Sequence, residues 1–413
     1  MSAALAGVVL AVACGCGSGA EPSRESSERA AVQRVLDRQA AAVRGGEEGA
    51  YLATVDPREE SYRSAQRRVF ENLRRLPLTQ WTYQVGNVQR TGEAGEDGDE
   101  GGKDGSRSRI EADVRLRYKL RGDDQTPVSA TERLAFTERG GKWYVSAELP
   151  DSDRQLWEQG EVTVVRGKQS LVLGADRSRE ALRALAGKAD RAVAEVDREW
   201  PRGWPRRVVV EAPSSLRNMA QLLDAPASSY EGIAAVTTGE AGEYTDAPAD
   251  RIVVNPEAYG ELSGEGQQVV VTHETVHVAS RTHTGRATPL WLSEGLADWI
   301  GYGARGRGPK EAAAELVRAA EDGKLPHELP ADRDFRFGSD PEALGRAYES
   351  GWLACRLIAD EWGEKKLMAL YLRVGSSQKR QDAAVDEAMQ AELGLSLEEF
   401  TERWRSYVEK ELG

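Results

Sequence analysis

The chain has 413 residues, which is enough for roughly two or three domains. Its 55 Lys and Arg residues against 68 Asp and Glu residues give a net charge of −13, which argues against binding to nucleic acid or to an anionic lipid surface. Hydrophobic residues make up 40% and charged residues 30%, as in a soluble globular protein, and three cysteines are too few for a disulfide-rich scaffold.

The N-terminus carries an apolar run over residues 3–13, which has the length of a signal-peptide core and is too short to span a bilayer as a helix. Small residues then lead into Cys14, with Cys16 as the competing position, and a polar stretch continues to residue 26. This pattern resembles the lipobox of bacterial lipoproteins, whose cysteine becomes lipidated. The resemblance implies export and attachment to the membrane through a lipid on Cys14, and a secreted protein is the alternative.

Residues 27–150 predict helices first and strands afterwards. Apolar residues recur at helical spacing in two segments, and segments that alternate apolar and polar side chains follow, which is typical of antiparallel strands with one solvated face. The helical segments are 30–43 and 58–76, and the alternating segments are 81–85, 110–120, 129–137 and 142–147. We therefore expect an α+β domain here.

This order of elements resembles the nuclear transport factor 2-like fold, also called SnoaL-like, and implies helices packed on a curved antiparallel sheet. That fold hosts enzymes and binding modules alike, so it assigns no chemistry. Residues 91–109 hold no apolar side chain larger than Ala and predict a long polar loop. Because the first histidine of the chain is His273, we expect this domain to be a spacer or docking unit that the chemistry does not need.

Residues 151–160 are polar and indicate a linker, and residues 161–413 indicate a second α+β domain. Its early part alternates strands with helices, and from residue 267 onward it is nearly all helix. The expected strands are 162–165, 170–173, 206–210, 233–237 and 251–254, and the expected helices before residue 267 are 177–200 and 214–223.

The strongest motif is HExxH, formed by His273, Glu274 and His277. The flanking Val and Thr residues favour a strand by propensity. Positions i and i+4 lie about 13 Å apart in a strand, which is too far to share one ion. In a helix they lie about 6 Å apart on one face, and both imidazoles can reach a single zinc. The pairing of the histidines therefore predicts a helix that is buried on most sides.

A third protein ligand is expected downstream, where residues 291–299 read Trp-Leu-Ser-Glu-Gly-Leu-Ala-Asp-Trp. Glu294 and Asp298 lie four residues apart and share one face of a predicted helix. The Glu294 carboxylate can bind the metal, and Asp298 can accept the second ring N–H of a ligand histidine.

These motifs resemble those of gluzincin zinc peptidases, in the peptidase MA-like set that is similar to the aminopeptidase N and thermolysin groups. Residues 347–353, Ala-Tyr-Glu-Ser-Gly-Trp-Leu, also resemble the helix that carries the transition-state tyrosine of aminopeptidase N-like enzymes. The resemblance covers about residues 162–413. It implies one Zn²⁺ per chain on His273, His277 and Glu294, with Glu274 as general base, Tyr348 as oxyanion stabiliser and Asp298 behind a ligand histidine.

The chain departs from those groups at two points. Sixteen residues separate His277 from Glu294, slightly fewer than in the better-known groups. The Gly-x-Met-x-Asn strand that binds a free amino end in aminopeptidases is absent, which leaves endo- and exopeptidase activity open. Residues 251–255 are the expected strand edge for pairing with a substrate.

The sequence therefore predicts an exported zinc peptidase that hydrolyses peptide or protein substrates with a metal-activated water. His283 and His327 are weaker candidate site residues. Two histidines and a carboxylate also suit non-haem iron, but a glutamate placed within HExxH to act on a water favours zinc. The alternative function is a lipid-tethered binding or scaffold module whose peptidase fold no longer turns over.

Overall fold

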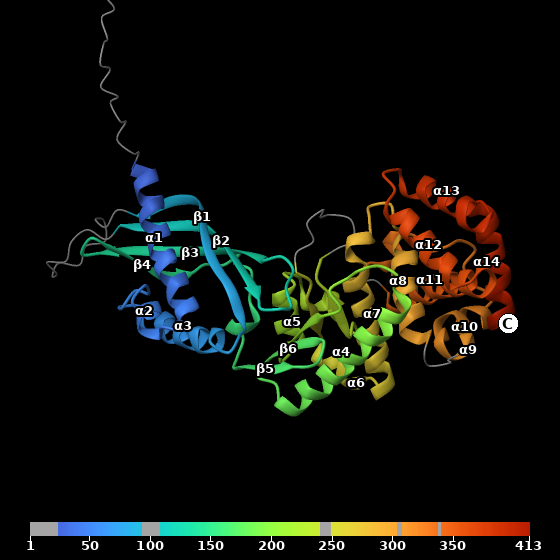
Figure 1. Cartoon of the computed structure of the whole chain (residues 1–413), viewed down its shortest axis with the longest axis horizontal. Coiled ribbons are helices and arrows are strands. Elements are labelled where there is room, and N and C mark those ends of the chain that lie inside the picture. The colour runs from blue at the N-terminus through green and yellow to red at the C-terminus, as the bar shows by residue number, and fades with distance from the viewer. Residues whose placement is uncertain (1–23, 93–107, 240–248, 304–307, 338–339) are drawn as a thin grey trace, which may run out of the picture.

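The computed structural model describes residues 24–92, 108–239, 249–303, 308–337 and 340–413. Two sheets with their helices come first along the chain and a helical lobe follows, so the molecule has the predicted α+β class (Figure 1). The predictions for Cys14 and for residues 93–107 lie outside the described residues. Within the described ranges, no helix is long and apolar enough to cross a membrane.

The first part consists of three helices and an antiparallel sheet, in the predicted order. The sheet has the order β1-β2-β3-β4, and α1 packs along β1. Along β2, buried and exposed side chains alternate, because one face of the strand is covered and the other faces solvent. The elements are α1 (Arg24–Gly45), α2 (Glu48–Leu52), α3 (Glu60–Leu73), β1 (Leu78–Gly92), β2 (Arg109–Leu120), β3 (Val128–Arg139) and β4 (Lys142–Glu148).

The second sheet has the order β5-β6-β7-β9-β8. Strands β6, β7 and β9 run parallel, whereas β5 and β8 are antiparallel to their neighbours and form the two edges. Helix α4 packs against β5, β6 and β7. The elements are β5 (Val162–Arg166), β6 (Ser170–Ala175), α4 (Arg179–Glu199), β7 (Val208–Ala212), α5 (Leu216–Leu222), β8 (Ala235–Thr237), β9 (Ile252–Val254) and α6 (Pro256–Glu261).

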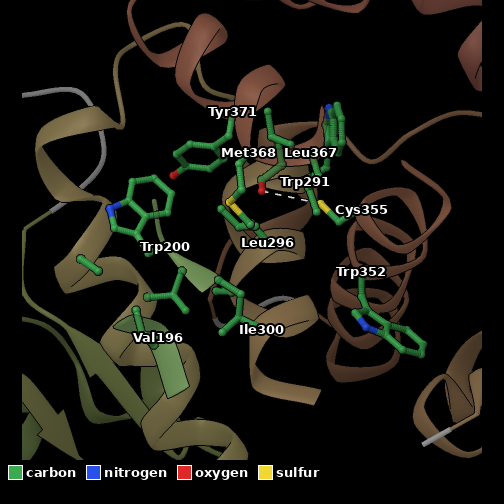
Figure 2. Close-up of a cluster of buried hydrophobic side chains, with 14 of the residues drawn as sticks. Val196, Trp200, Trp291, Leu296, Ile300, Trp352, Cys355, Leu367, Met368 and Tyr371 are labelled. Carbon is green, nitrogen blue, oxygen red and sulfur yellow. Dashed lines mark hydrogen bonds between the residues drawn. The ribbon is translucent and has the colours of Figure 1, made fainter. Parts of the chain in front are cut away.

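The rest of the described chain is helical, as predicted. Its helices are α7 (Gly264–Ser280), α8 (Leu290–Gly303), α9 (Pro309–Ala312), α10 (Ala314–Glu321), α11 (Pro341–Trp362), α12 (Glu364–Gly375), α13 (Gln381–Leu393) and α14 (Leu397–Leu412). Figure 2 shows the apolar core of this lobe, where Trp200 at the end of α4, Leu296 of α8, and Met368 and Tyr371 of α12 converge. The Cys355 thiol is buried in it, 3.9 Å from the carbonyl oxygen of Leu292.

Helices α8 and α11 approach each other closely because two glycines face each other. A Cβ atom on Gly295 would lie 2.2 Å from the carbonyl oxygen of Gly351, and one on Gly351 would lie 2.7 Å from that of Trp291. Any larger residue would push the helices apart. The glycines of the two sequence motifs thus allow the close approach of α8, which carries Glu294, and α11, which carries Tyr348, and both of these side chains lie beside His273.

The first part of the chain covers one face of the second sheet. Alternate residues of β6 point to opposite sides, so Val172 joins the core beneath α4, whereas Leu171 and Leu173 join a second core with Trp81 and Tyr118 of the first sheet. The two parts thus share a hydrophobic core, and the structure does not support the expected independence of residues 27–150.

Residues 151–160 are packed and do not form a solvated linker. A short 3-10 helix, Leu156–Glu158, buries Leu156 and Trp157 between the two parts, and the Trp157 ring lies 5.0 Å from that of Tyr118. Asn72 donates hydrogen bonds to the carbonyl oxygens of Trp157 and Gly160 at 2.8 and 2.7 Å. The polar composition of this segment concealed the two residues that anchor it.

Candidate metal centre

The HExxH segment is helical, in helix α7, although many of its residues are β-branched. Ser263 caps the start by accepting a hydrogen bond from the backbone N–H of Gly266. The helix packs between α4, α8 and β8. Its buried hydroxyls are satisfied, since Thr272 donates to Glu195 at 2.8 Å and Thr275 donates to the backbone of the preceding turn. Burial on several sides thus outweighs the strand propensity of the segment.

The structure brings the three predicted ligands together. Nε2 of His273 lies 3.1 Å from Nε2 of His277 and 3.1 Å from Oε2 of Glu294, and Nε2 of His277 lies 3.3 Å from that same oxygen. For ligand bonds of about 2.0–2.1 Å, tetrahedral zinc sets its donor atoms about 3.3 Å apart. The three side chains are 12–17% exposed, so the set is not fully sealed from solvent. Among the described residues, they form the one group of His, Cys, Asp and Glu side chains placed to hold a metal ion.

Asp298 fixes the orientation of His273. Its Oδ1 lies 2.8 Å from Nδ1 of His273, which assigns the ring proton to Nδ1 and leaves the Nε2 lone pair facing His277 and Glu294. Two imidazole nitrogens at 3.1 Å, with a carboxylate oxygen beside them, form a site that a cation stabilises. The donor types and the spacing therefore both fit zinc.

The pKa values of His273 and Glu294 are shifted by the groups that they contact. Burial lowers the pKa of His273, but Asp298 and Glu294 outweigh this effect and raise it well above the usual value. Burial raises the pKa of Glu294, but His277 and His273 outweigh it and hold the pKa well below its usual range. A proton therefore competes with a metal for Nε2 of His273, so we expect metal affinity to weaken as the pH falls.

Glu274 lies outside the ligand set and has a partner of its own. It is buried, and its Oε2 accepts a hydrogen bond of 2.7 Å from the hydroxyl of Thr237 in β8. The same hydroxyl lies 3.1 Å from the backbone carbonyl oxygen of Glu274. Sequence reasoning missed Thr237, because nothing in the spacing of residues 233–237 marks one threonine of a short strand as a neighbour of the HExxH helix.

Tyr348 lies beside the ligand set on α11, with its ring centroid 6.2 Å from that of His273. Burial and the nearby Glu294 and Asp298 carboxylates raise its pKa well above the usual value, so the hydroxyl stays protonated at neutral pH and can donate a hydrogen bond. A cavity of about 460 Å³ adjoins Tyr348 and Asp298. Its apolar walls include Ile233, Tyr302, Leu344 and Trp352.

The substrate-pairing edge predicted at residues 251–255 is wrong. Strand β9 lies inside the sheet, where it pairs with β7 on one side and with β8 on the other. The edge next to the ligand set is β8, whose Ala235, Val236 and Thr237 pair only with β9 among the described strands. Sequence alone does not show which of two short apolar strands lies at the edge of a sheet, so the edge position of β8 could not be predicted.

The two other candidate histidines lie outside the ligand set. His283 packs edge-on against Trp200, at 5.7 Å between ring centroids. His327 lines a separate cavity near α13 and α14. Neither belongs to the group of side chains that could hold a metal ion among the described residues.

No protein-family model and no curated protein matches the chain. Among solved structures, it is similar to a variant of a two-domain M1 zinc metallopeptidase bound to L-arginine, with 16% identity and a TM-score of 0.33. That match covers 66% of this chain and 58% of the other, so this chain spans less than two thirds of its length. It is also similar to a variant of an M1 zinc metallopeptidase from Deinococcus radiodurans bound to a Tyr-Ser-Ala substrate, with 13% identity and a TM-score of 0.34 over 81% of this chain and 86% of that one. With likenesses this weak, function is inferred from the site itself.

Proposed function

We propose that the chain is a zinc-dependent peptidase with one Zn²⁺ held by His273, His277 and Glu294. The observation that supports this most strongly is the convergence of two imidazole nitrogens and one carboxylate oxygen at mutual distances of 3.1, 3.1 and 3.3 Å. A bound zinc would supply Lewis acidity and lower the pKa of a water towards neutrality. The remaining chemistry falls to the side chains around the ligands.

Glu274 is proposed as the general base. It takes a proton from the water that attacks the scissile carbonyl and passes it to the nitrogen of the leaving amine. It suits this role because it is buried, lies between the two histidines in the sequence, and does not belong to the ligand set. Tyr348, which keeps its proton at neutral pH, donates a hydrogen bond to the oxyanion that forms on the carbonyl oxygen.

The position of β8 supports a peptide as the substrate. An edge strand presents unpaired backbone N–H and C=O groups, and an extended peptide can add to it as another strand. The cavity of about 460 Å³ next to Tyr348 has the apolar walls that suit a large apolar or aromatic substrate side chain. We propose that β8 aligns the peptide and that this cavity receives one of its side chains.

The test combines elemental analysis with digestion of a mixed peptide library. The wild-type chain should contain about one zinc and cleave the library, whereas Glu274→Gln should keep the zinc and lose cleavage, because an amide cannot accept the proton. Zinc without cleavage in both proteins would instead favour the binding or scaffold module. Absence of zinc from the wild-type chain would refute the site.

Export and lipid anchoring remain a separate proposal that rests on the sequence around Cys14. In a bacterial host, Cys14→Ala should release the protein from the membrane fraction, and Cys16→Ala should not. Release by Cys16→Ala alone would move the lipidation site to that residue.

A further inference from the structure

The hydrogen bond between Thr237 and Glu274 joins the edge strand to the proposed base. The hydroxyl of Thr237 donates to Oε2 of Glu274 at 2.7 Å, and its backbone pairs with Ile252 in the sheet. One residue therefore touches both the carboxylate that moves the proton and the strand on which a peptide would lie. The same hydroxyl lies 3.1 Å from the backbone carbonyl oxygen of Glu274, and these are the hydrogen bonds found from β8 side chains to α7 among the described residues.

A glutamate has two equivalent oxygens and three rotatable side-chain bonds, so a general base of this type needs a partner that fixes it. The bond from Thr237 occupies Oε2 and leaves Oε1 as the oxygen that is free to accept a proton. The donor is held in turn by the sheet, because β8 is paired with β9 and packs against α7. The edge strand is thus held in place by the sheet, and through Thr237 it holds the Glu274 carboxylate in place.

We propose that Thr237 is a positioning residue that holds Glu274 with Oε1 directed at the water and Oε2 bound to the edge strand. This inference rests on the proposed function. It adds that a peptide paired with β8 and the general base Glu274 would both be held by the same strand. The side chain of Thr237 would then set the position of the base relative to the peptide.

Three variants test the proposal. Thr237→Val keeps the shape of the side chain and removes the donor, Thr237→Ser keeps the donor, and Thr163→Val makes the same change on β5, the opposite edge of the sheet. Thr237→Val should lower kcat about 10²-fold while KM and zinc content change by less than about twofold. Thr237→Ser should keep most of the activity, and Thr163→Val should match the wild type.

A measurement that is independent of activity separates this inference from the proposed function. Thr237→Val should lower the melting temperature of the wild-type chain by more than that of Glu274→Ala, because the side-chain acceptor is absent from that background and only the backbone carbonyl oxygen of residue 274 remains as an acceptor. An equal effect in both backgrounds, an unchanged kcat in Thr237→Val, or a Thr237→Ser variant as slow as Thr237→Val would each overturn the role of Thr237. If the wild-type chain cleaves no peptide, the proposed function fails, and the melting temperatures alone decide whether Thr237 holds Glu274.

Discussion

The buried ion pair between Asp124 and Arg251 offers a direct test of how tightly the two parts of the chain are joined. Asp124 lies in the turn between β2 and β3, and its carboxylate accepts hydrogen bonds from Nη1 and Nη2 of Arg251 at 2.8 and 3.0 Å. The side chains are 1% and 6% exposed. The second carboxylate oxygen also accepts a bond of 2.7 Å from the backbone N–H of Leu120, so the groups that bond the Asp124 carboxylate are all donors.

Asp124→Asn should therefore be strongly destabilising. The amide keeps the size of the carboxylate, but its NH₂ group faces donors. The buried Arg251 charge is then left with the Glu211 carboxylate at 3.6 Å and the backbone carbonyl oxygen of Asp250 at 3.1 Å. Removing one partner of a buried pair costs about 3–5 kcal/mol, and the contact with Glu211 should reduce this to about 2–4 kcal/mol. Urea unfolding with a fitted m-value measures the loss.

The matched control is Asp322→Asn, which breaks an ion pair whose side chains are 63% and 75% exposed. It should change the stability by less than about 0.5 kcal/mol. The reasoning would be refuted if Asp124→Asn cost less than about 1 kcal/mol, or no more than the control, because the interface would then not depend on this pair.

Three further outcomes are expected. Tyr348→Phe should keep its fold and its zinc but lose about 10²-fold or more in kcat, and near wild-type kinetics would leave Tyr348 as a packing residue. The double variant His273→Ala/His277→Ala should contain no zinc, and a chelator should lower the melting temperature of the wild type but not of this variant. Burial raises the pKa of Glu349 from 4.5 to about 7, although hydrogen bonds from backbone N–H groups at the start of α10 lower it. Between pH 4.5 and about 7 the folded chain therefore binds more protons than the unfolded chain. Stability should then fall as the pH rises through that window, and Glu349→Gln should flatten this part of a pH series of urea melts.

Much of the fold could be predicted from sequence because its signals are local. Alternation along residues 110–120 and helical spacing along residues 30–43 each reflect a single element and its buried face. The HExxH helix could also be predicted against propensity, because two histidines four residues apart can share an ion only in a helix. The roles of the site residues remain predictions for the experiments above.

The features that were missed depend on which elements become neighbours. Tertiary packing places β8 rather than β9 at the sheet edge and brings Thr237 into contact with Glu274. Neither feature produces a periodic pattern of apolar residues in the sequence. The shared core was hidden for a similar reason. Leu171 and Leu173 look like any buried strand residues, and only the structure shows that their cover comes from the first part of the chain.

That shared core limits how the molecule can move. The joint between the two parts buries Trp157 and the Asp124–Arg251 pair, and bending a hinge there would expose them to solvent. Motions that admit a peptide and release its fragments should therefore take place on the side of the helical lobe, while the first part and the second sheet turn as one body. A spectroscopic distance measured between labels on α1 and β5 should accordingly show one narrow distribution, with or without a bound peptide.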